Sequence, residues 1–117
     1  MDRTNEALAA ATDALHPAVL RAIAMTVEGA RRHGRRISVC GGLASDLTAI
    51  PLLVGLGVTR LSCTPALIPR IKSLVRSLDT ATWVEIARTA LDLDDAAAVR
   101  ALVRRLTPAT LTEGTGA

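Results

Sequence analysis

The chain of 117 residues is long enough for one domain with a modest core, and its 50% hydrophobic content excludes a disordered tail. With one Trp, no Phe and no Tyr, it lacks an aromatic platform for single-stranded nucleic acid, and a net charge of +3 is too small to indicate nucleic-acid binding. Short apolar runs, a polar N-terminus and two cysteines outside any CxxC motif predict a cytoplasmic protein without a membrane partner.

The N-terminal third predicts two helices. Residues 4–15 are rich in alanine, and this helix should end at His16-Pro17, because a residue that precedes proline avoids the α region. Pro17 suits the first turn of the next helix, whose apolar residues recur at helical spacing as far as residue 30. Gly34 is the expected stop. The arginines at 31, 32, 35 and 36 indicate a solvated helix end, or alternatively a patch for phosphate or a partner.

Two short runs bounded by glycines are typical of buried strands, residues 36–40 and 58–63. Between them we expect a turn at Gly41-Gly42 and a helix over residues 44–55, which Pro51 should shorten or kink. A further helix should begin at Thr64-Pro65, with Thr64 as N-cap, and run to about residue 78. The alternation of strands and helices predicts an α/β fold with a parallel sheet.

The C-terminal part predicts two more helices and a tail. One helix should open at Asp79 or Thr80, or a few residues later at the capping-box spacing of Thr82 and Glu85, and the last should open at residue 94 or 95. Residues 107–117 are expected to form a flexible tail. Two parallel strands are a poor end point, because such strands need covered faces and neighbours on both edges. The sequence therefore predicts an incomplete α/β architecture.

The segment Ser38–Asp46 resembles the active-site cysteine motif of enzyme I of the bacterial sugar phosphotransferase system, whose pattern is Cys-Gly-Glu-x-Ala-x-Asp. The similarity continues in one colinear order over roughly residues 2–106, through Asp2-Arg3-Thr4-Asn5-Glu6, His16-Pro17-Ala18-Val19-Leu20, Leu61-Ser62-Cys63 and Pro69-Arg70-Ile71-Lys72. The resemblance implies that residues 1–106 form the last two βα units of a phosphoenolpyruvate-utilising (β/α)8 barrel, helix-rich, with extra N- and C-terminal helices.

The resemblance also implies roles for individual residues. Cys40, expected at the carboxyl end of the first strand, would protonate the enolate as pyruvate forms, and the alternative is a buried structural cysteine. Gly41 and Gly42 would bind substrate through backbone N–H groups, or else only form a tight turn. Gly42 stands where the family has Glu, which puts the proton relay in doubt. Arg3 would hold the substrate's phosphate or carboxylate, unless it is merely a mobile terminal arginine. Asp46 should orient the helix that follows.

The parent reaction transfers phosphate from phosphoenolpyruvate to a protein histidine with Mg²⁺. The magnesium-binding carboxylates and the phosphohistidine domain are expected outside this sequence, so we expect an inactive fragment or truncated relative that binds no Mg²⁺ by itself. The alternative is a non-catalytic dimerisation or interaction module derived from the barrel. A relative of pyruvate phosphate dikinase or phosphoenolpyruvate synthase ranks lower, because their cysteine motifs differ. The expected partner is a second copy of the chain or another barrel fragment.

Overall fold

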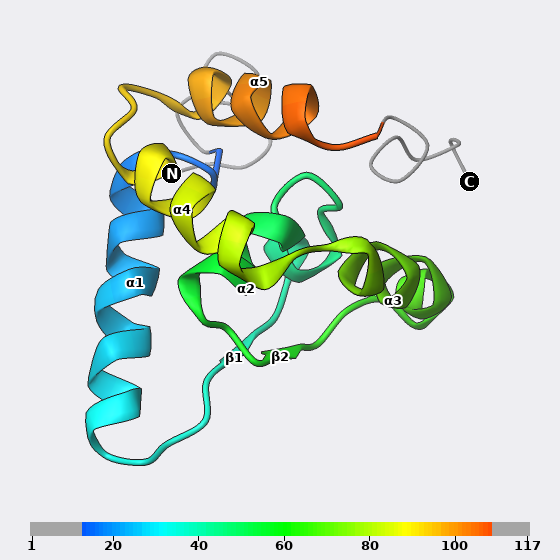
Figure 1. Cartoon of the computed structure of the whole chain (residues 1–117). Helices are drawn as coiled ribbons and strands as arrows, with labels where there is room; N and C mark the ends of the chain where they lie inside the picture. Colours follow the sequence, from blue (N-terminus) through cyan, green and yellow to red (C-terminus); the bar gives the residue numbers. More distant parts are fainter. Residues whose placement is uncertain (1–12, 109–117) are drawn as a thin grey trace, which may run out of the picture.

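The computed structural model describes residues 13–108, which form five α-helices and a two-stranded sheet (Figure 1). The order is α1 (Pro17–Arg32), β1 (Ser38–Val39), the 3-10 helix η3 (Gly42–Ser45), α2 (Ile50–Leu56), β2 (Arg60–Leu61), the 3-10 helix η4 (Pro65–Leu67), α3 (Ile68–Ser77), α4 (Thr80–Leu91) and α5 (Ala96–Leu106). Most of the helix expected over residues 4–15 lies outside the described residues. The fold is a helix-rich α/β arrangement, as predicted. None of the described helices is both long and apolar enough to span a membrane.

The start of α1 is fixed by the residues predicted for it. Residues 13–15 are a turn rather than the end of a helix, because the Asp13 carboxylate accepts the N–H of Leu15 at 3.0 Å. His16 then acts as the N-cap, and its Nδ1 accepts the N–H of Ala18 at 3.1 Å. After α1 ends, Gly34 adopts a left-handed φ of 61°, which confirms it as the stop.

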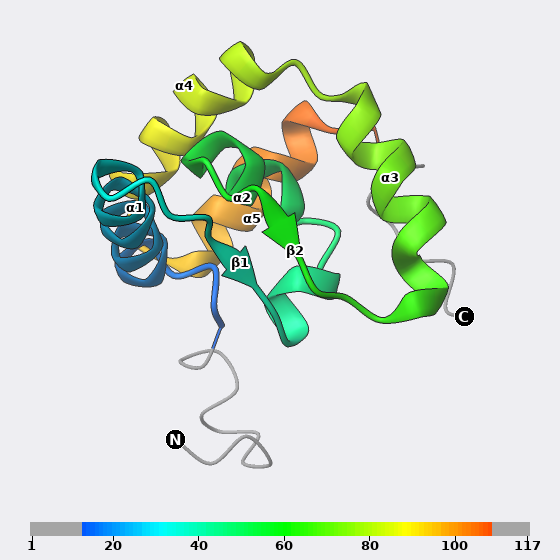
Figure 2. The ribbon, with the colours of Figure 1, turned by 90° about the horizontal axis from the view of Figure 1, so that it is seen from below.

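The two strands pair in parallel, with Ser38 opposite Arg60 and Val39 opposite Leu61. Each strand spans two residues, which is shorter than the predicted runs. The pairing continues one residue further, where the Ser62 N–H donates to the Val39 carbonyl at 2.8 Å. Viewed from below, β1 and β2 lie side by side in front of α2, with α1 and α3 on either side (Figure 2).

The two faces of the sheet differ sharply in chemistry. On one face Val39 and Leu61 are half-buried and pack against a cluster of Val27, Leu53 and Val58. The opposite face, which we call the open face, carries exposed residues because side chains alternate along a strand. Its members are Ser38, Cys40, Arg60 and Ser62. Helices therefore cover one side of the sheet, and the other side is polar.

The helix predicted over residues 44–55 is not continuous. The chain instead forms η3, turns, and enters α2 at Ile50, so Pro51 falls in the first helical turn. Proline lacks an N–H and is compatible with that position, whereas the interior of a longer helix would lose a hydrogen bond. The side chains of Ile50, Leu52 and Leu53 are fully buried, which makes α2 the centre of the core.

Helix α2 packs closely on α4. A side chain at Gly55 would collide with the backbone carbonyl of Trp83, which is itself 5% exposed. The core is aliphatic apart from this tryptophan, as the composition predicted. Gly55 thus lets the backbones of α2 and α4 approach each other more closely than any other residue would allow.

The remaining helices begin near the predicted positions. Asp79 and Asp95 are the N-caps of α4 and α5, accepting the N–H groups of Thr82 at 3.1 Å and Ala98 at 2.8 Å. The helix predicted from Thr64 is divided into η4 and α3. Thr64 holds the predicted N-cap position before Pro65, but its side chain makes no capping hydrogen bond. Thr107, where we expected the tail to begin, is buried and its hydroxyl donates to the Val103 carbonyl.

Candidate functional site

Cys40 lies where the motif predicted, directly after β1 and before a glycine turn and η3. The cysteine is exposed, which contradicts the alternative of a buried structural thiol. Gly41 has a φ of 76°, a conformation that glycine adopts without strain. Its carbonyl accepts the N–H of Ala44 at 3.2 Å and closes the turn. The turn therefore presents a thiol to solvent at the carboxyl end of a parallel strand.

Gly42 and Gly41 are both exposed, so their backbones are accessible to a ligand, and binding of substrate by either remains a prediction. A Cβ added at Gly42 meets no atom within 4 Å. The family's glutamate would consequently fit at this position without a steric change. Arg3, the third predicted substrate-binding residue, lies outside the described residues. The structure thus brings together Cys40, Gly41 and Gly42, which are neighbours in sequence.

Two hydrogen-bonded links join the Cys40 turn to the segment after β2. Besides the Ser62 bond to Val39, the Thr64 N–H donates to the Ser45 hydroxyl oxygen at 3.2 Å. Thr64, predicted as a helix cap, therefore acts as a link between the two strand ends. Cys63 is half-buried and packs beside the cluster of Leu47, Ile50, Ile71 and Leu74, as its predicted packing role requires.

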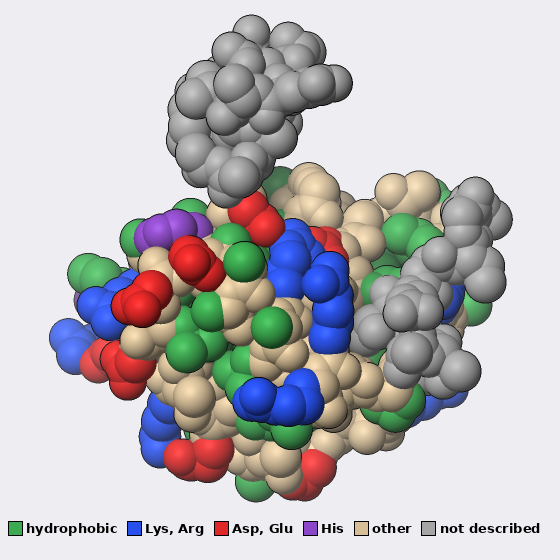
Figure 3. Space-filling model, turned by 90° about the horizontal axis from the view of Figure 1, so that it is seen from above, with side chains coloured by type: hydrophobic (Ala, Val, Ile, Leu, Met, Phe, Trp, Pro, Cys, Tyr) green, Lys and Arg blue, Asp and Glu red, His purple; other side chains and the backbone are tan. Residues whose placement is uncertain are grey.

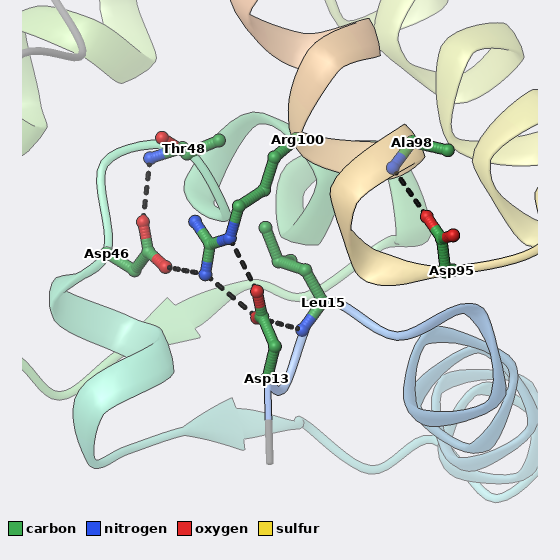
Figure 4. Close-up of polar contacts among 7 residues, drawn as sticks. All are labelled: Asp13, Leu15, Asp46, Thr48, Asp95, Ala98 and Arg100. Carbon is green, nitrogen blue, oxygen red and sulfur yellow. Dashed lines mark hydrogen bonds and ion pairs between the residues drawn. The ribbon is translucent and has the colours of Figure 1, made fainter. Parts of the chain in front are cut away.

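A cluster that sequence reasoning missed lies beside this turn. Arg100 binds Asp13 through both carboxylate oxygens, with Nε–Oδ2 and Nη2–Oδ1 distances of 2.7 and 2.8 Å, and its Nη2 lies 3.0 Å from Asp46 Oδ2 (Figure 4). The other Asp46 oxygen accepts the Thr48 N–H at 3.0 Å. Asp46 was predicted to orient the following helix, and its carboxylate bonds to Thr48, two residues before α2 begins.

The electrostatics of this cluster follow from its hydrogen bonds. The bond from Arg100 is the main cause that lowers the pKa of Asp13, and partial burial opposes it. The same bond to Asp13 raises the pKa of Arg100, with Asp46 adding to the effect. On the face above α5, basic side chains lie directly beside acidic ones (Figure 3). Nothing in the sequence signals the cluster, because Arg100 is 87 residues from Asp13 and 54 from Asp46.

The described residues do not fit a magnesium site. Within residues 13–108, no group of three or more His, Cys, Asp or Glu side chains is arranged to hold a metal ion. Asp13 and Asp46, the carboxylates of the cluster beside the Cys40 turn, are engaged by Arg100. Of the predicted site residues that the structure describes, Cys40 presents an exposed thiol.

An exposed cysteine on a glycine turn at the end of a parallel strand is what the α/β domains of phosphoenolpyruvate-utilising enzymes were expected to show. Residues 1–80 match the family model described as "PEP-utilising enzyme, PEP-binding domain", and the chain belongs to this family.

Curated relatives show which proteins of this family the chain resembles. The chain is 49% identical over 102 residues to the multiphosphoryl transfer protein of Xanthomonas campestris pv. campestris, covering 87% of this chain and 12% of the relative. It is 34% identical over 106 residues to the phosphoenolpyruvate-protein phosphotransferase of Listeria monocytogenes, covering 91% of this chain and 18% of the relative. The chain therefore spans less than a fifth of the length of these relatives, and corresponds to a segment of this family's proteins.

Proposed function

We propose that the chain acts as part of a phosphoenolpyruvate-protein phosphotransferase, in which it supplies the last two βα units of a (β/α)8 barrel. The observation that carries this proposal is the position of Cys40, exposed at the carboxyl end of β1, in a chain that belongs to the phosphoenolpyruvate-binding family. Active sites of such barrels lie at that end of the strands. The order of strand, helix, strand and helix supports the same assignment.

Cys40 then acts as a general acid. When the bond from phosphorus to the enol oxygen breaks, the histidine of the phosphohistidine domain takes the phosphoryl group. The enolate oxygen becomes a carbonyl, and the methylene carbon takes the proton of the Cys40 thiol. The products are pyruvate, phosphohistidine and a Cys40 thiolate, which recovers a proton from water before the next cycle. A thiol suits this task because its unperturbed pKa of about 8.5 is close enough to neutral pH for proton exchange.

The isolated chain is inactive in this proposal because the site is completed by other segments. The described residues offer no magnesium site, and the open face of the sheet presents polar groups to solvent. In the family, magnesium neutralises phosphoryl charge when bound, and the carboxylates for it are expected in the remainder of the barrel. Gly41 and Gly42 would approach the substrate through their backbones, and Arg3 would hold an anionic group of it.

A chimera tests the proposal. The chain replaces the matching segment of the Listeria monocytogenes phosphotransferase, and pyruvate release from phosphoenolpyruvate is measured. We expect the chimera to turn over and the isolated chain to release no pyruvate at the same concentration. In the chimera, Cys40→Ala should lower the rate at least ~100-fold, which is the usual contribution of general acid catalysis. Cys63→Ala is the matched control, and we expect it to leave the rate within about twofold of the parent.

Two results would contradict the proposal. Full activity of the Cys40→Ala chimera would remove the assigned acid, and turnover by the isolated chain would show that it is not a fragment. A chimera that folds but does not turn over would instead favour the interaction module. The presence of Gly42 where the family has glutamate supports that alternative.

A further inference from the structure

Arg100 connects three segments that are distant in sequence. It extends from α5 to Asp13, which precedes α1, and to Asp46, which lies between η3 and α2 (Figure 4). The three side chains are 21–27% exposed, so this network is far less solvated than the described ion pairs of Arg21, Arg32 and Arg88, whose side chains are at least 60% exposed. Partly buried pairs are screened by salt much less than exposed ones.

Asp46 is the joint between the Cys40 turn and α2. Its N–H donates to the Leu43 carbonyl at 3.3 Å, and its carbonyl accepts the Ile50 N–H at 3.1 Å. One carboxylate oxygen accepts the N–H of Thr48, and the other faces Arg100. Backbone bonds on both sides of Asp46 and the side-chain bond to Arg100 together hold the segment between η3 and α2.

The turn itself is exposed. Cys40, Gly41 and Gly42 all face solvent, and the bond from Ala44 to the Gly41 carbonyl joins two parts of the same turn. The turn is attached to the rest of the molecule by the bond from Ser62 to Val39, by the core packing of Leu43 and Ala44, and by Ser45 and Asp46. Asp46 is bonded to Leu43 within this segment, so it connects the turn to Arg100.

We infer that Arg100 is a positioning residue for Cys40, acting through Asp46, so that α5 belongs to the apparatus that holds the proton donor in place. This inference rests on the proposed function for its catalytic meaning. Arg100 lies outside residues 1–80, which match the family model, so the matched segment depends for its geometry on a side chain beyond it. The bidentate pair with Asp13 fixes the orientation of the Arg100 guanidinium, and its Nη2 also donates to Asp46.

Thiol chemistry and hydrogen exchange test this inference in the full chain, with Cys63→Ala as background so that Cys40 is the one thiol. The rate of Cys40 alkylation by iodoacetamide is measured from pH 6 to pH 10, together with deuterium uptake of peptides covering residues 40–48. For Arg100→Met we expect exchange in residues 40–48 to rise about tenfold and the alkylation profile to move along the pH axis. Arg100→Lys keeps the positive charge but loses the bidentate geometry of the guanidinium. We therefore expect it to show the same changes in exchange and alkylation as Arg100→Met.

Arg105→Met is the matched control, because Arg105 is an exposed arginine on the same helix, and it should match the parent in both readouts. If Arg100→Met does not fold, the same two measurements are made on Asp46→Asn, for which we expect the same changes. This substitution weakens the contact between Arg100 and residue 46 and leaves the pair of Arg100 with Asp13 in place. A lowered melting temperature with an unchanged alkylation profile and unchanged exchange in residues 40–48 would overturn the inference, as would an equal effect of Arg105→Met.

These readouts do not depend on turnover. An altered Cys40 profile in an inactive chimera would leave the positioning role intact and reject the proposed function. An unaltered Cys40 profile in Arg100→Met, together with a chimera that loses its activity on Cys40→Ala, would support the proposed function and reject the positioning role.

Discussion

Replacing Gly55 by Ala should destabilise the chain by about 2 kcal/mol. The new methyl group would meet the backbone carbonyl of Trp83, which cannot move aside as a flexible side chain would, so α2 must shift away from α4. Overpacking of a core costs about 1–3 kcal/mol, and a clash with backbone belongs at the upper end of that range. Alanine returns up to about 1 kcal/mol of helix propensity. The overpacking cost less the gain in helix propensity leaves about 2 kcal/mol, which is a large part of the 5–15 kcal/mol that stabilises a typical domain.

Equilibrium unfolding in urea measures this effect by far-UV circular dichroism and by the fluorescence of Trp83, which lies at the contact itself. Gly29→Ala in α1 is the matched control, because a Cβ there meets no atom within 4 Å, so it should stabilise the chain by about 0.5–1 kcal/mol. The two substitutions are chemically identical and should have opposite signs. Equal stability of the Gly55→Ala variant and the parent would refute the reasoning that α2 is held by close backbone contact.

Three further outcomes are expected. Because Arg100 lowers the pKa of Asp13, that carboxylate contributes fully to stability above its ordinary pKa of 3.8. The contribution is lost as the pH falls through the lowered pKa of the folded chain. Asp13→Asn should therefore cost about 1–3 kcal/mol at pH 7 in urea unfolding and progressively less as the pH is lowered below 3.8, and a constant cost across that range would contradict this. Gly42→Glu should leave the melting temperature within about 2 °C, and in the chimera it should raise turnover, whereas a large loss of stability would show a hidden contact. Sedimentation at micromolar concentration should give more than the monomer mass of 12.2 kDa, because the sheet has two free edges; a clean mass of 12.2 kDa would show that prediction to be wrong.

The helix boundaries that depend on local chemistry could be predicted from the sequence. Pro17, Gly34 and Asp79 act through their own backbone or through bonds to residues two or three positions away, so a short window of sequence contains the whole cause. The same holds for the position of Cys40, which a β-branched run and two glycines define.

Features that depend on distant partners could not be predicted. Thr64 resembles a helix cap in sequence, but its hydroxyl lies 3.5 Å from the Ser45 hydroxyl, 19 residues away, and makes no capping bond. The place where α2 begins is set partly by Asp46, whose bonds extend to Arg100. An arginine at helical spacing near the end of a helix ordinarily indicates a solvated position, and only the folded chain shows two carboxylates beside it.

The open face of the sheet restricts what can associate with it. Arg60 points outward beside Ser38 and makes no ion pair with another described residue. A strand that covered this face with aliphatic side chains would strip water from an unpaired guanidinium, at a cost of several kcal/mol. An outward charge of this kind discourages promiscuous pairing at exposed sheets. A segment that completes the sheet must therefore bring an anion to Arg60, whether it comes from a second copy of the chain or from another barrel fragment.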